Sequence, residues 1–192
     1  DKILIQTPVY HPFFNVVTNS ERTLVCSSLI EDAPGHYVMD YEDFEAKAKD
    51  GVKYFILCNP HNPVGRCWQP DELRRIGEIC MRYGVTVISD EIHSDLMLFG
   101  HVHTPFASLS EEFGAHTITC IAVSKTFNLA GLQSSTLIFP NAEMKGIYDQ
   151  NLKKMDIARN NCFSTVATIA ACEKGEEWLG QLITYLEGNM RF

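Results

Sequence analysis

Three polar residues that come after apolar runs are the ones in this chain whose types and positions could do chemistry. Lys125 lies just beyond the apolar run 121–123, and a lysine at the end of a buried strand is costly unless it is paired or used covalently. Asp90 and Asn59 each follow a similar apolar run. The lysine is therefore a candidate for covalent chemistry, with the carboxylate and the amide as candidate partners.

The elements that would position these residues are predicted from hydrophobic periodicity. Short apolar runs alternate with amphipathic stretches, which is typical of an α/β fold with a mainly parallel sheet. Strands are predicted at residues 2–6, 23–27, 54–58, 85–89, 117–123 and 135–139. Helices are predicted at residues 11–18, 41–49, 70–83, 142–155, 165–174 and 176–186. Because ligands collect at the carboxyl ends of parallel strands, Asn59, Asp90 and Lys125 are expected at one edge of the sheet.

The composition excludes several classes of protein. The 192 residues carry a formal net charge of −8, with 45% hydrophobic and 21% charged residues, so a general nucleic-acid or anionic-membrane surface is not expected. No apolar run of the sequence approaches the roughly 20 residues that span a bilayer. The seven cysteines form no CxxC pair, which favours a reduced, cytoplasmic protein. Cys58, Cys80 and Cys120 are expected to be small core residues.

Three segments, residues 59–65, 88–93 and 121–133, resemble in order and spacing the active-site set of fold-type I pyridoxal 5'-phosphate (PLP) enzymes. The first reads Asn-Pro-His-Asn-Pro-Val-Gly, and the last contains Ser-Lys-Thr-Phe-Asn-Leu-Ala-Gly-Leu-Gln. The resemblance is to the class I/II aminotransferase superfamily, and within it to the MalY/PatB-type cystathionine β-lyase branch. It implies the three-layer, mainly parallel α/β sheet of an aspartate aminotransferase-like large domain. Residues 1–192 would be the central part of that PLP-binding domain, with the N-terminal segment and the C-terminal small domain absent.

The resemblance implies a role for each of the three polar residues. Lys125 would be the Schiff-base lysine, which binds the cofactor aldehyde and later moves the Cα proton. Asp90 would pair with the pyridine nitrogen, and Asn59 would donate to the phenolic oxygen. The structural alternatives are a surface lysine, a capping or turn aspartate and an ordinary Asn-Pro turn. Cis peptide bonds at Asn59–Pro60 and Thr7–Pro8 are implied as well.

Three further residues are implied to contact the cofactor. Tyr10 would stack on the pyridine face, His93 would hydrogen-bond near the phenolic oxygen, and Ser124 would contact the phosphate. A core or rim tyrosine and a satisfied loop histidine are the alternatives for the first two. Many class I relatives carry a serine and an arginine at the positions of Ala122 and Gln133, so the phosphate site departs from that of a standard aminotransferase.

Other titratable residues near these motifs are interpreted as structural. Glu91 is expected to be a structural partner rather than a catalyst. His101 and His103 form a His-x-His pair with no Asp, Glu or Cys at ligand spacing. They are therefore expected to be solvated, and no metal site is predicted.

The resemblance implies a PLP-dependent carbon–sulfur β-lyase. Its substrate would be a small cystathionine- or cysteine-type amino acid, and its products would be pyruvate, ammonia and a thiol. A PLP-dependent aminotransferase is the first alternative, and a non-catalytic fragment that keeps the fold is the second. The implied assembly is a cytoplasmic homodimer of the full-length protein, with no nucleic-acid or membrane partner. The 192 residues alone are expected to be largely inactive.

Overall fold

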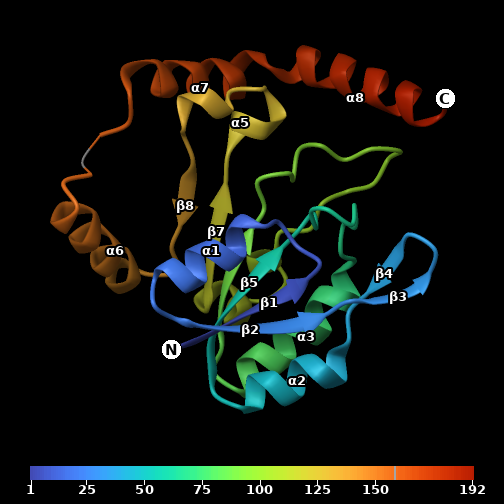
Figure 1. Ribbon diagram of the computed structural model, residues 1–192. Coiled ribbons are helices and arrows are strands. Elements are labelled where there is room, and N and C mark those ends of the chain that lie inside the picture. Colours follow the sequence, from blue (N-terminus) through green and yellow to red (C-terminus); the bar gives the residue numbers. More distant parts are fainter. Residues whose placement is uncertain (158) are drawn as a thin grey trace. The chain divides into compact units, whose positions relative to one another are not determined.

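The computed structural model describes residues 1–157 and 159–192, and it divides into two compact units (Figure 1). The first unit holds Asp1–Asp90 and Thr104–Thr119, and the second holds Glu91–His103 and Cys120–Phe192. Strand β7 (Thr117–Ile121) begins in the first unit and ends in the second. No helix of the described residues is long and apolar enough to cross a bilayer.

The first unit is built around a parallel sheet. Its strands, in spatial order, are β2 (Thr23–Ser28), β1 (Lys2–Thr7), β5 (Val52–Cys58), β6 (Thr86–Asp90) and the start of β7. Its helices are α1 (Pro12–Asn19), α2 (Tyr41–Lys49), α3 (Pro70–Arg82), the 3-10 helix η1 (Phe106–Ser108) and α4 (Glu111–Ala115). Strands β3 (Ile30–Ala33) and β4 (His36–Val38) form a separate antiparallel ribbon. The register pairs Cys58 with Asp90, so β5 and β6 end at the same level.

Alternate residues of these strands face opposite sides of the sheet, as strand geometry requires. On one side Leu57 packs in a cluster with Phe44 of α2 and Ile76 of α3, and Figure 1 shows these two helices next to each other. On the other side Ile56 packs with Phe13 of α1. Each such side chain contributes roughly 1.5–3 kcal/mol when it is fully buried. The first unit therefore has helices on both faces of a parallel sheet, the three layers that the sequence predicts.

Helix α3 begins at Pro70, the residue at which it is predicted to begin. Gln69 is the N-cap, Pro70 lies in the first turn, and the Glu72 carboxylate accepts from the Gln69 backbone N–H at 2.8 Å. This capping box satisfies N–H groups that the first turn leaves unpaired. Glu72 also accepts two hydrogen bonds of 2.8 Å from Arg66. The cap therefore ties the start of α3 to the loop that follows β5.

The second unit consists of the segment after β6 and the chain that follows β7. Its helices are α5 (Val123–Thr126), the 3-10 helix η2 (Ala130–Leu132), α6 (Ala142–Lys154), α7 (Cys162–Lys174) and α8 (Glu176–Met190). Strand β8 (Thr136–Ile138) lies beside β7 and runs in the opposite direction (Figure 1). Helices α7 and α8 meet at Gly175, where an added Cβ would lie 2.4 Å from the Phe127 ring. Only glycine leaves room there for Phe127, which packs on Trp178 with 5.5 Å between ring centroids.

The structure confirms the predicted strands and helices and shifts some of their boundaries. Strand β7 ends at Ile121 rather than at residue 123, because Val123–Thr126 form helix α5. The β3–β4 ribbon, α4, α5 and the 3-10 helices have no counterpart in the prediction, since such short elements carry little periodic signal. The predicted cis bonds at Thr7–Pro8 and Asn59–Pro60 are present, together with a third at Asn62–Pro63.

Candidate active site

Asn59 directly follows β5, as predicted, and is fully buried. Its Oδ1 accepts a hydrogen bond from the Trp68 backbone N–H at 3.1 Å, and its Nδ2 donates to the Thr104 carbonyl oxygen at 3.3 Å. Its backbone N–H donates to the Asp90 carbonyl oxygen at 3.0 Å. The amide is therefore held with its NH2 group as the donor. Trp68 and Thr104 are neighbours of the candidate site that no sequence motif indicates.

Asp90 is the last residue of β6 rather than the residue that follows the strand, and it is half-buried. Strand β6 ends one residue later than predicted, because Asp90 still pairs with Cys58 across β5 and β6. The first unit thus brings Asn59 and Asp90 together at the carboxyl ends of adjacent parallel strands. In open α/β sheets this is the position where ligands bind.

The cysteines expected in the core differ in burial. Cys58 and Cys80 are buried, as predicted, whereas Cys120 is only half-buried. Burial, and to a smaller extent the charge of Asp90, raises the pKa of the Cys58 thiol to about 12. The thiol is therefore neutral at physiological pH and acts as a small apolar side chain next to the candidate site.

Tyr10 lies in the loop between β1 and α1 and is 39% exposed. Its ring meets Phe13 edge-on, with 5.9 Å between the ring centroids. Phe13 is itself buried and packs in a cluster with Ile5 of β1. Tyr10 is thus anchored on one side and open to solvent, a placement that suits stacking on a flat ligand.

Lys125 is the third residue of α5 and is exposed. The prediction that it ends a buried strand is wrong, because the backbone leaves the strand at Ile121 and enters the helix after its N-cap, Ala122. The cost of burying a lysine therefore does not apply here. Its amine is accessible for covalent chemistry, and Ser124 beside it is half-buried.

His93 lies in the segment that follows β6 and is half-buried. Burial lowers the pKa of His93, and the positive charge of Lys125 lowers it further. A neutral imidazole has one nitrogen that donates and one that accepts a hydrogen bond. The second unit thus brings together His93 and Lys125, two of the predicted site residues.

A hydrogen bond that the sequence does not indicate fixes helix α5. Thr126 is fully buried, and its hydroxyl donates to the Asp95 carboxylate at 2.9 Å. The bond ties the helix that carries Lys125 to the segment that carries His93. Its two residues lie 31 positions apart, outside any periodic pattern, so only the folded chain reveals the pair.

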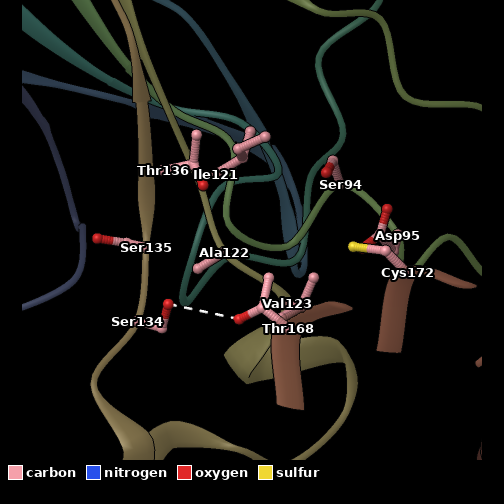
Figure 2. A pocket seen from close by; sticks show the side chains of 10 residues that line it. All are labelled: Ser94, Asp95, Ile121, Ala122, Val123, Ser134, Ser135, Thr136, Thr168 and Cys172. Atoms are coloured by element: carbon pink, nitrogen blue, oxygen red, sulfur yellow. Dashed lines mark hydrogen bonds between the residues drawn. The ribbon is translucent and has the colours of Figure 1, made fainter. Parts of the chain in front are cut away.

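A pocket of about 150 Å³ lies beside α5 in the second unit (Figure 2). Half of its ten lining residues carry a hydroxyl group, among them Ser94, Ser134 and Thr168, and Thr168 donates to Ser134 at 3.4 Å. Ala122 also lines it, at the position where a serine is expected in many class I relatives. Hydroxyl groups can donate or accept, so the pocket suits a polar group.

Glu91 and His103 form a buried pair in the second unit. The His103 Nε2 lies 2.8 Å from the Glu91 carboxylate, and the two side chains are 8% and 2% exposed. The prediction that His103 is solvated is wrong, because a carboxylate buried directly after a strand requires a polar partner. His101 is exposed, as predicted, and Glu91 has a structural partner. Within the described residues, no group of three or more His, Cys, Asp or Glu could hold a metal ion.

The family model for aminotransferases of class I and II matches residues 1–174, a range that includes Asn59, Asp90 and Lys125. The chain belongs to this family. It is a family of PLP-dependent enzymes, so the candidate residues lie in a chain whose relatives use that cofactor.

Individual relatives match over nearly the whole chain. The chain is 49% identical over 191 residues to cystathionine beta-lyase PatB of Bacillus subtilis (strain 168), a match that covers 99% of this chain and 49% of that protein. The structure matches a PLP-bound protein from Clostridium difficile 630 with a TM-score of 0.97 and 55% identity, covering 100% of this chain and 49% of that one. It matches the PLP-bound C-S lyase from Staphylococcus hominis with a TM-score of 0.91 and 37% identity, covering 100% and 48%. The chain spans about half the length of the relatives it matches.

Proposed function

We propose that the full-length protein containing this chain is a PLP-dependent carbon–sulfur β-lyase that acts on a cystathionine- or cysteine-type amino acid. The observation that carries the proposal is the pairing of Asn59 and Asp90. An amide fixed as a donor and a carboxylate lie together at the ends of two paired strands. The relatives support the type of reaction, since they include a cystathionine beta-lyase and a C-S lyase.

The residues of the first unit fit one side of PLP. The pyridine nitrogen of PLP needs a carboxylate, and its phenolic oxygen needs a hydrogen-bond donor. Asp90 supplies the carboxylate. Asn59 supplies the donor, since its Nδ2 carries a second hydrogen besides the one directed at Thr104. Tyr10 supplies an aromatic face for the ring.

The residues of the second unit fit the remaining groups of PLP. The aldehyde needs a primary amine, and the phosphate needs hydrogen-bond donors. Lys125 supplies an exposed amine on α5. Ser124 supplies a hydroxyl next to it, and His93 supplies a neutral imidazole near the amine. We propose Lys125 as the catalytic residue and the others as cofactor-binding residues.

Each residue would then do a defined task. When bound, PLP supplies an electron-accepting ring that makes the Cα–H bond of an amino acid acidic. The Asp90 carboxylate would hold a proton on the ring nitrogen, which keeps the ring positively charged. Lys125 would hold the cofactor and, after the substrate amine displaces it, accept the Cα proton on Nζ. A neutral His93 would place no second positive charge near the Lys125 amine.

An aminotransferase that uses the same residues is the second candidate, and the family itself favours it. Two residues weigh against it, Asn128 and Gln133, and Gln133 ends η2 in a left-handed conformation with φ 51°. Glutamine lacks the planar fork with which arginine binds a phosphate group through two hydrogen bonds. A non-catalytic fragment that keeps the fold is the third candidate.

Pyruvate release separates these candidates. We expect the full-length protein with PLP to release pyruvate from L-cystathionine without any keto acid. Lys125→Ala should lower that rate by about 10³-fold, since the variant lacks the base. Conversion only in the presence of a keto acid would favour the aminotransferase. No conversion under either condition would contradict both enzymes.

We also propose that residues 1–192 form the central part of a large PLP-binding domain in a cytoplasmic homodimer that binds no nucleic acid. The net charge of −8 opposes binding to phosphate backbones. Within the described residues the seven cysteines form no disulfide bond, which suits a reducing compartment. Sedimentation velocity of the full-length protein should give twice the monomer mass, and a monomeric mass would contradict the dimer.

A further inference from the structure

Trp68 is 1% exposed and contacts the end of β5 at two successive residues. Its indole Nε1–H donates to the Cys58 carbonyl oxygen at 3.1 Å. Its backbone N–H donates to the Asn59 Oδ1, also at 3.1 Å. One buried residue thus holds both the last residue of the strand and the amide that follows it.

The second of these bonds decides which way the Asn59 amide faces. A side-chain amide has an oxygen that only accepts and a nitrogen that only donates. Because a backbone N–H can only donate, the atom that meets Trp68 must be Oδ1. The NH2 group then points away from Trp68, with one hydrogen directed at the Thr104 carbonyl oxygen. Any ligand atom that approaches the second hydrogen must be an acceptor.

Trp68 is itself held in place from two sides. The Arg66 guanidinium lies over the indole ring, 4.8 Å from its centroid, and the His61 ring meets it edge-on at 5.5 Å. Arg66 is fixed in turn by its two hydrogen bonds of 2.8 Å to Glu72, in the capping box of α3. A cationic group over an indole contributes about 0.5–2 kcal/mol. The orientation of Asn59 therefore depends on a chain of contacts that reaches the start of α3.

We propose that Trp68 is a positioning residue that presents the Asn59 amide as a hydrogen-bond donor to the phenolic oxygen of PLP. This inference rests on the proposed function, since it takes PLP as the ligand. The indole does not touch the ligand. It acts through the Cys58 carbonyl and through the backbone N–H whose position it sets.

The test uses the full-length protein loaded with PLP, and its readout is the pH midpoint at which the visible absorbance band of the lysine-bound cofactor changes. A donor to the ring oxygen favours its negatively charged form, so weakening that donor raises the midpoint. Asn59→Asp keeps an acceptor for the Trp68 N–H, removes the donor and adds a negative charge, so it sets the upper limit of the shift. Trp68→Phe removes only the indole N–H and part of the ring.

We expect Trp68→Phe to raise the midpoint by about half a pH unit or more, in the same direction as Asn59→Asp. If Trp68→Phe does not fold, benzothienylalanine at position 68 replaces it, because this side chain keeps the bicyclic shape and has sulfur in place of the N–H. Phe44→Leu is the packing control. It loosens a buried contact with Phe55 and should lower the melting temperature without moving the midpoint.

Two outcomes would overturn the inference, and they are distinct. If Trp68→Phe or the benzothienylalanine variant lowers the melting temperature as Phe44→Leu does, with an unchanged midpoint, Trp68 has only a structural role. If the wild-type protein shows no absorbance band that is lost in Lys125→Ala, the proposed function fails, and the inference fails with it.

Discussion

At the scale of single residues, the carboxylate of Glu91 is buried and therefore requires a polar partner. It is almost fully enclosed, and the His103 imidazole lies 2.8 Å from it. Removing one partner from such a pair costs more than the pair contributes, because the remaining charge stays buried. The segment Glu91–His103 begins and ends with this pair, so the pair holds together the two ends of the segment that carries His93.

His103→Ala should therefore destabilise the full-length protein by about 3 kcal/mol. The matched control is His101→Ala, two positions away and exposed, which should change the free energy of unfolding by less than about 0.5 kcal/mol. Urea unfolding followed by circular dichroism measures both. Equal effects of the two substitutions would show that the Glu91–His103 pair contributes nothing specific.

The charge of Lys125 should be visible in the titration of His93. Burial and Lys125 both lower the pKa of His93, so Lys125→Ala should raise it. Because the folded pKa lies below the unfolded value of about 6.5, the contribution of His93 to stability is present above that pH and is lost as the pH falls toward the folded pKa. The variant should lose less stability over that range.

NMR titration of isotope-labelled histidine in the cofactor-free protein measures the effect. Lys145→Ala is the control, since Lys145 pairs with Asp149 on α6 and should leave the His93 titration unchanged. A His93 pKa that moves equally in both variants, or in neither, would contradict the predicted proximity of His93 to Lys125.

At the scale of elements, helices α3 and α4 can pack closely because position 77 of α3 is a glycine and has no side chain. A Cβ added to Gly77 of α3 would lie 2.3 Å from the Phe113 ring of α4, and Phe113 is buried and stacks on Phe106. Glycine is a poor helix former, so its presence in a helix interior is explained by this close packing.

Gly77→Ala should therefore destabilise the protein by about 2 kcal/mol, because the overpacking outweighs the gain in helix propensity. Gly146→Ala on α6 is the matched control. Nothing lies within 4 Å of its added Cβ, so it should stabilise by about 0.5–1 kcal/mol. Thermal unfolding compares the two, and a stabilising Gly77→Ala would contradict the close packing.

The elements differ in how far the sequence alone predicts them. Strand β5 and helix α3 follow from strong local signals, an apolar run before Asn59 and a proline followed by acidic residues in the first turn of the helix. Helix α5 could not be predicted, because the apolar run continues past Ile121 and nothing local marks the turn from strand to helix. The roles of Trp68 and His103 depend on contacts between segments distant in sequence, which periodicity does not report.

At the scale of the whole molecule, the chain spans about half the length of its relatives, so the proposed turnover has to be measured on the full-length protein. Covalent binding of PLP tests the role of a lysine more directly than turnover does, because binding requires only the cofactor and an accessible amine. We propose that this amine is the one on Lys125.

Reduction with borohydride followed by peptide mass spectrometry tests that claim. Borohydride converts the linkage between a lysine and PLP into a stable bond that survives digestion. We expect the full-length protein, incubated with PLP and reduced, to carry the cofactor on the peptide that contains Lys125, and Lys125→Arg to carry none. A cofactor found mainly on other lysines, or equal labelling of wild type and variant, would contradict the assignment of Lys125 as the PLP-binding lysine.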